Sequence, residues 1–370
     1  MKIAFAHFQT LNVPRGIERY VIEISSELIK KGHEVHIVAG KTTEQNHCYL
    51  LHPEARVHLL PHWDWRKKSV FPFYLAHFLQ NKYDLVFVFF GYCEGWAVRL
   101  SQFLGGNSYA IIFQYPLAGH AHRYNEFRRF SAAMKADILV AVSEYVAQGV
   151  HECFNVWPSV IPNGVNVDHF KPESQSIPSV RAKLGVGTDD RILMTCCSLE
   201  PRKGVQHIIN ALPKVVAEFQ NVCLIVVGDG WYKAALSSEV KRLGLSDRVM
   251  FLGNRKDVHE LYSAADVFLL LSEYEAFGIV VLEAMASGTP VVVSVGSAFP
   301  EIVPEKCGLR VEPTDSSQVA HAIHSLLGDD ALRLNLGNES INYVKERFTW
   351  KHVADSLVNA ISEKIPADVR

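Results

Sequence analysis

The sequence lacks long apolar runs, an excess of charge of one sign and low-complexity segments, and each absence excludes a class of protein. The longest apolar stretches, such as LVFVFF at residues 85–90, are far too short to span a bilayer. A formal net charge of −2 does not indicate nucleic-acid binding. With 48% hydrophobic and 21% charged residues, the chain has the composition of an ordinary globular protein.

Cysteine is present but without the spacing of a disulfide framework. The seven cysteines are odd in number, show no paired metal-ligand spacing and mostly fall in apolar runs. We therefore expect reduced, buried thiols in a cytoplasmic protein. The opening residues, MKIAFAHF, alternate like a first strand and do not resemble a signal peptide.

What is abundant is alternation between short β-branched runs and helical patterns, in both halves of the chain. This alternation is typical of parallel sheets wound by crossover helices, and 370 residues exceed what one core comfortably supports. The stretch at residues 161–180 gathers Pro, Asn-Gly and Ser, which indicates a turn followed by a linker. The predicted strands lie near residues 2–6, 34–39, 56–60, 84–90, 109–113 and 138–142, then 191–197, 222–227, 248–252, 266–272 and 290–294.

The predicted architecture is α/β, with two doubly wound, Rossmann-like parallel-sheet domains facing a cleft. We place the domains at residues 1–170 and 171–347, and a terminal helix at 348–370 is expected to pack at the domain junction. In such domains ligands collect at the carboxyl ends of the strands. Helices of the second domain are predicted to begin near Gly204, Trp231, Asp257 and Gly278.

One carboxylate, Glu283, stands in the otherwise apolar segment from Gly278 to Gly288. A lone charge in a packed interior is costly unless something pairs with it. Glu275 lies at the end of a buried strand, beside the amino terminus of the helix that Gly278 opens, where N–H groups attract anions. Either both carboxylates line a site for a hydroxyl-rich, partly negative ligand, or Glu283 is a solvated surface residue and Glu275 a cap.

A second candidate anion site follows the strand at 191–197. Arg202 and Lys203 stand just before Gly204, which begins a helix with one apolar face. Two cations beside a helix amino terminus match a pyrophosphate, although a solvated basic turn is the alternative. Gly16, after the first strand, would let the backbone approach a ligand or simply turn the chain. The glycines of VVGDGW, residues 226–231, could likewise only end a strand.

The segment EYEAFGIVVLEAMASGTPVVVS resembles the donor-site signature of retaining GT-B glycosyltransferases of family 4, whose Glu-x(7)-Glu spacing is matched by Glu275 and Glu283. PRKGV, VVGDG, VMFLGN, IPNGVNVDHFKP and GHEVHIV resemble further blocks of that family. The resemblance therefore covers nearly the whole chain. It implies transfer of a sugar from a nucleotide diphosphate sugar to a hydroxyl of a glycan, lipid or small molecule, with retained anomeric configuration and no required metal ion.

Carried onto matching positions, the resemblance gives the site residues their roles. Glu283 would bind the ribose hydroxyls, Glu275 with the backbone around Phe277 would hold the donor sugar, and Lys203 would stabilise the leaving diphosphate. The candidate catalytic residues are Glu275, Lys203, Arg202 and His120. The candidate donor-binding residues are Gly16, Ser198, Lys203, Asn254, Arg255, Glu275, Ala276, Phe277, Gly278, Ile279 and Glu283, with Asn254 and Arg255 near the base.

The chain departs from the family pattern at three places. Ser198 stands where the family commonly has a pyrophosphate-binding arginine, so Arg202 would have to substitute for it. Arg15 stands where the family often has the first glycine of a pair. The frequent histidine after the fifth strand is displaced, which leaves His120 as a contact to the sugar or as a surface residue. A degenerate, non-catalytic nucleotide-sugar-binding protein is therefore the alternative function.

Two enzyme classes with related features fit less well. A glycoside hydrolase needs two carboxylates flanking the scissile bond, whereas Glu275 and Glu283 belong to one loop and helix. A nicotinamide dehydrogenase needs a third glycine that GDGWYK lacks.

The segment at residues 62–78 mixes aromatic side chains with Arg66, Lys67 and Lys68. Such a mixture suits contact with an anionic lipid surface, so peripheral membrane contact on the cytoplasmic face is one interpretation of this segment. The alternative is a set of core aromatics flanked by a solvated basic turn.

Overall fold

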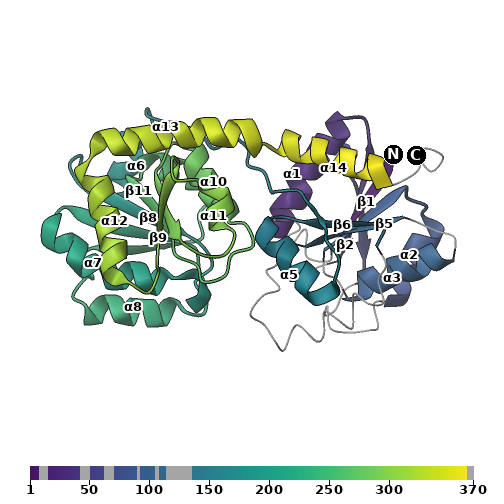
Figure 1. Ribbon diagram of the computed structural model, residues 1–370, viewed down its shortest axis with the longest axis horizontal. Coiled ribbons are helices and arrows are strands. Elements are labelled where there is room, and N and C mark those ends of the chain that lie inside the picture. Colours follow the sequence, from purple (N-terminus) through teal and green to yellow (C-terminus); the bar gives the residue numbers. More distant parts are fainter. Residues whose placement is uncertain are drawn as a thin grey trace. The chain divides into compact units, whose positions relative to one another are not determined.

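A computed structural model describes residues 1–7, 16–41, 51–61, 71–89, 92–104, 108–113 and 136–364. The chain divides into two compact units, and Figure 1 shows one sheet in each. The first unit comprises Met1–Gly164 and Trp350–Arg370, and the second comprises Val165–Thr349. Every strand pair within the two sheets is parallel, so the predicted α/β class with two Rossmann-like domains is confirmed.

The sheet of the first unit has the order β3-β2-β1-β4-β5-β6-β7. Its strands are β1 (Lys2–Ala6), β2 (Glu34–Gly40), β3 (Arg56–Leu60), β4 (Leu85–Val88), β5 (Tyr109–Phe113), β6 (Ile138–Ala141) and β7 (Ser159–Val160), and its described helices are α1 (Gly16–Lys30), α2 (Phe71–Gln80), α3 (Tyr92–Phe103), α5 (Glu144–Phe154) and α14 (Trp350–Lys364). Helix α1 buries Val21, Ile24 and Leu28, spaced for one face of a helix. It ends before Gly32, whose φ of +82° disfavours any side chain.

Helix α14 returns the chain to the first unit. Its first residue, Trp350, meets Tyr20 of α1 edge to face, with ring centroids 5.7 Å apart. Lys31, just after α1, forms an ion pair with Asp355 of α14. The helix therefore packs on α1.

The sheet of the second unit has the order β10-β9-β8-β11-β12-β13. Its strands are β8 (Arg191–Cys196), β9 (Val222–Val227), β10 (Val249–Gly253), β11 (Val267–Leu270), β12 (Val291–Ser294) and β13 (Gly308–Val311), and its helices are α6 (Ile177–Leu184), the 3₁₀ turn η3 (Pro201–Lys203), α7 (Val205–Glu218), α8 (Lys233–Arg242), α9 (Val258–Ala264), α10 (Ile279–Ala286), α11 (Phe299–Ile302), α12 (Ser316–Gly328) and α13 (Asp330–Arg347). The strand order reverses between β8 and β11. Such a switch point is where doubly wound sheets bind ligands.

The predicted linker at residues 161–180 is wrong at its end, because α6 begins at Ile177. Pro178 lies in the first turn, where its missing N–H group leaves no intrahelical hydrogen bond unmade. Gly185 closes the helix with φ +67°. None of the described helices is both long enough and apolar enough to cross a bilayer.

Candidate functional site

The site begins with two neighbouring strands, β8 and β11. They pair in parallel, with Val267 opposite Leu193 and Phe268 opposite Met194. The chain leaves them toward opposite edges of the sheet, so the loops that follow them both lie at the switch point. One loop carries Arg202 and Lys203, and the other carries Glu275.

Close backbone contacts fasten these two loops together. Gly204 has φ +73°, and a Cβ atom there would lie 1.8 Å from the carbonyl oxygen of Leu271. Glu273 donates its backbone N–H to the carbonyl oxygen of Arg202 at 2.9 Å. As a result Lys203 Nζ forms an ion pair with Glu275 Oε2, and the two side chains are only 13% and 14% exposed.

The glycines of the GDG turn serve the same packing. A Cβ atom at Gly228 would lie 1.9 Å from the carbonyl oxygen of Cys197, and one at Gly230 would lie 2.3 Å from that of Leu199. Leu199 donates its N–H to the carbonyl oxygen of Asp229 at 3.0 Å. These glycines therefore do more than end β9, because they let its loop press against the loop after β8.

Two helix amino termini, those of α7 and α10, open at this edge of the sheet. Their N-caps are Gly204 and Gly278, and neither makes a side-chain capping hydrogen bond. Neither helix has an acidic residue in its first turn. A helix start without a capping side chain favours an anion as the partner of its N–H groups, and at α10 the Glu275 side chain lies close to Gly278.

The loop that carries Glu275 is held by a residue that the sequence analysis missed. Ser297 Oγ accepts a hydrogen bond from the Glu275 N–H at 3.1 Å and donates one to the carbonyl oxygen of Glu273 at 2.9 Å. Ser297 has φ +62°, which is uncommon for a residue other than glycine. The only sequence signal was its place in the short turn after β12.

Glu283 is buried, with 3% of its surface exposed, so the alternative of a solvated surface residue is wrong. The hydroxyl of Tyr262 on α9 donates to Glu283 Oε2 at 3.0 Å. Burial, with Cys196 and Glu283 nearby, holds the pKa of Tyr262 well above its usual range. Tyr262 could not be predicted as a site residue, because an aromatic residue on an apolar helix face resembles ordinary core.

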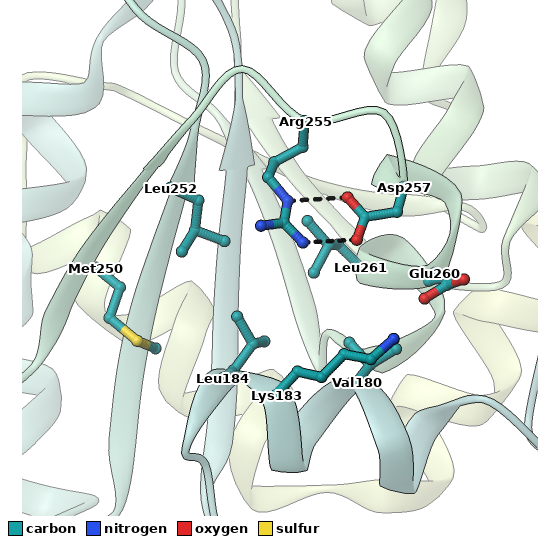
Figure 2. Close-up of a pocket in the computed structure, with 9 residues that line it drawn as sticks. All are labelled: Val180, Lys183, Leu184, Met250, Leu252, Arg255, Asp257, Glu260 and Leu261. Atoms are coloured by element: carbon teal, nitrogen blue, oxygen red, sulfur yellow. Dashed lines mark hydrogen bonds and ion pairs between the residues drawn. The ribbon is translucent and has the colours of Figure 1, made fainter.

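The residues predicted to lie near the base are on the loop after β10. Asn254 is exposed, and Arg255 makes a two-pronged ion pair with Asp257, at 2.8 and 2.6 Å. Figure 2 shows this pair beside a cavity of about 380 Å³ between α6, β10 and α9. The cavity is lined by Val180, Lys183, Leu184, Met250, Leu252, Arg255, Asp257, Glu260 and Leu261.

Arg202, the expected substitute for the missing arginine, is already engaged. Its Nε donates to Glu200 Oε2 at 2.9 Å, and its Nη1 lies 3.5 Å from the carbonyl oxygen of Tyr274. Ser198 is exposed. Burial raises the pKa of the Cys197 thiol to about 11, which makes that thiol a poor nucleophile.

The remaining site predictions fall in the first unit. Gly16 is the first residue of α1, and among the described residues outside its own helix none would lie within 4 Å of a Cβ atom there. His120 and Arg15 lie outside the described residues. Within the described ranges, no three His, Cys, Asp or Glu side chains gather in a way that could hold a metal ion.

Two family models match consecutive parts of the chain. The model described as Glycosyltransferase Family 4 matches residues 14–169, and the one described as Glycosyl transferases group 1 matches residues 176–343. The chain belongs to the group 1 glycosyltransferases of the GT-B fold. The resemblance found in the sequence is thereby confirmed.

Individual relatives agree with this family. The chain is 27% identical to the N-acetyl-alpha-D-glucosaminyl L-malate synthase of Bacillus anthracis over 88% of each protein. It is 31% identical to a GDP-mannose-dependent monoacylated alpha-(1-6)-phosphatidylinositol monomannoside mannosyltransferase of Corynebacterium glutamicum, over 62% of this chain and 63% of the relative. Anabaena HepE, solved with UDP-glucose, shares the fold with a TM-score of 0.86 at 22% identity, covering 98% of this chain and 100% of HepE.

Proposed function

We propose that this glycosyltransferase moves a sugar from a nucleotide diphosphate sugar to an acceptor hydroxyl, with retention of anomeric configuration and without a required metal ion. The observation that carries the proposal is the Lys203–Glu275 ion pair at the switch point, together with the uncapped starts of α7 and α10. Departure of the diphosphate builds negative charge, and a fixed cation and helix N–H groups stabilise such charge. The lysine supplies charge for the leaving group and keeps the carboxylate oriented toward the sugar.

The donor would span the second unit in a defined order. Its ribose hydroxyls bind Glu283, its sugar binds Glu275 and the backbone of Ala276, Phe277, Gly278 and Ile279, and its base lies near Asn254 and Arg255. Attack by the acceptor hydroxyl on the same face as the departing diphosphate, assisted by an oxygen of that group, would retain the configuration. Relatives named for GDP-mannose and a neighbour solved with UDP-glucose support a nucleotide sugar as donor. The non-catalytic alternative gains no support, because Lys203, Glu275 and Glu283 are all present.

We also propose that the first unit contacts a membrane peripherally, on the cytoplasmic face. The basic part of the predicted segment, residues 62–70, lies outside the described residues, while residues 71–78 belong to α2. The observation that favours contact is on α3, which packs beside α2 (Figure 1). Trp96, Leu100 and Phe103 form one stripe on it, Leu104 follows the helix directly, and the four side chains are 40%, 36%, 78% and 58% exposed. An uncharged exposed stripe suits the acyl boundary of a bilayer, and a phosphatidylinositol-type acceptor is known by name among the relatives.

Product analysis tests the activity. Purified protein is incubated with UDP-, GDP- and ADP-sugars and a panel of glycan, lipid and polyol acceptors, with and without a metal chelator. The proposal predicts a product whose anomeric proton coupling in NMR spectra matches the configuration of the donor, in the presence of chelator. A product of inverted configuration would contradict the retaining mechanism, and loss of turnover with chelator would contradict metal independence.

A further inference from the structure

A buried hydrogen bond joins two helices of the second unit. Tyr262 lies on α9 and Glu283 on α10, 0% and 3% exposed, and the phenol donates to the carboxylate at 3.0 Å. Burial keeps the pKa of Tyr262 well above its usual range, so the phenol remains a donor at neutral pH and the carboxylate is the acceptor. The direction of this bond is therefore fixed.

The phenol itself is held from several sides. Thr289 Oγ1 donates to the Tyr262 backbone carbonyl at 2.6 Å. The ring meets Phe268 and Phe170 edge to face, with centroids 5.4 and 5.9 Å apart. Cys196, the last residue of β8, lies near the same hydroxyl and contributes to the raised pKa of Tyr262. These contacts fix the position of the Tyr262 ring, and with it the direction of its hydrogen bond to Glu283.

Core stability alone does not account for this pair. Replacing buried charged groups by well-packed apolar residues of similar volume is often neutral or stabilising. The bond from Tyr262 to Oε2 gives the Glu283 side chain a defined orientation.

We propose that Tyr262 is a positioning residue that sets the nucleotide's ribose specificity by holding the Glu283 carboxylate in one orientation. This inference rests on the proposed function, in which Glu283 binds the ribose hydroxyls. A vicinal diol needs acceptor oxygens in a set direction. A carboxylate without the Tyr262 hydrogen bond would still attract the nucleotide's hydroxyls, but it would discriminate less well between a ribose and a dideoxyribose nucleotide.

Calorimetric titration of the full chain with UDP, GDP and their 2′,3′-dideoxy counterparts tests the inference. The quantity compared is the ratio of dideoxy to ribose Kd for whichever base the wild-type chain binds. Tyr262→Phe should lower this ratio about tenfold, the size expected when a buried polar group loses its hydrogen-bond partner. In a Glu283→Gln background the same substitution should change nothing further, because Tyr262 acts only through Glu283. Tyr83→Phe, which removes a buried phenol hydrogen bond to His77 in the first unit, is the matched control and should leave the ratio unchanged.

Thr289→Val provides a second variant with nearly unchanged shape, should Tyr262→Phe fold poorly. It releases the Tyr262 backbone and should lower the ratio less than Tyr262→Phe. The positioning role would be overturned if Tyr262→Phe weakened the binding of ribose and dideoxy nucleotides equally, or if the ratio stayed unchanged in both variants. It would also be overturned if Tyr262→Phe lowered the ratio further in the Glu283→Gln background. A wild-type chain that binds neither nucleotide, or binds ribose and dideoxy forms alike, would instead refute the proposed binding function on which the inference depends.

Discussion

Replacing Lys203 with alanine should separate its chemical contribution from its structural one. The Lys203–Glu275 pair is 13% and 14% exposed, so the substitution leaves a mostly buried carboxylate without this cation. Breaking a fully buried pair costs about 3–5 kcal/mol, and we expect about 1–3 kcal/mol here because both groups retain some contact with water. Loss of a group that stabilises transition-state charge costs about 10² to 10³ in kcat.

The assay pairs initial rates with urea unfolding of the same samples. The double variant Lys203→Ala/Glu275→Ala should recover part of the lost stability, since no uncompensated carboxylate remains, yet should stay inactive. Lys214→Ala is the matched control, because Lys214 on α7 is exposed and donates to Ser316 and Ser317. A kcat for Lys203→Ala within tenfold of wild type, or activity regained in the double variant, would refute the reasoning.

Three other predictions concern backbone fit, pH and the apolar stripe. Gly204→Ala should lower the free energy of unfolding of the second unit by at least about 1–3 kcal/mol in urea, because it combines φ +73° with a Cβ atom 1.8 Å from the Leu271 carbonyl oxygen. An unchanged free energy of unfolding would show that the two loops can move apart without cost. Burial lowers the pKa of His77 to about 4. Between about pH 6.5 and 4, His77 is therefore protonated in the unfolded chain but still neutral in the folded chain. The free energy of unfolding should fall by about 2 kcal/mol from pH 7.5 to 5 through this group, and His77→Asn should flatten that fall; an equally steep fall in the variant would contradict it. Trp96→Ser/Phe103→Ser should reduce co-sedimentation with anionic phospholipid vesicles without changing stability by more than about 1 kcal/mol, whereas unchanged binding would exclude α3 as the contact.

The strands could be predicted from the sequence because parallel strands buried on both faces are nearly continuous runs of Val, Leu and Ile. Strands β11 and β12, with every residue buried, are the clearest cases. Helix α6 was missed because Pro178 looked like part of a linker, although proline suits a first turn. Local pattern alone does not distinguish these two uses of proline.

The candidate site was predictable in its parts but not in its connections. Lys203 and Glu275 each follow a strand, which marked both as residues of a ligand-binding edge. Their direct pairing depends on a backbone hydrogen bond between Glu273 and Arg202 and on a close approach at Gly204, contacts between segments about 70 residues apart. Such contacts leave no periodic signal in the sequence.

Thermal unfolding with a panel of UDP-, GDP- and ADP-sugars tests most directly whether the buried carboxylate serves a nucleotide sugar. A ligand at about 100 times its Kd adds about 2.7 kcal/mol to the free energy of unfolding, which corresponds to a Tm rise of about 5–10 °C for a unit of this size. The account predicts such a rise for at least one nucleotide sugar with the wild-type chain and a much smaller one with Glu283→Gln. An equal rise in both proteins, or none in either, would contradict it.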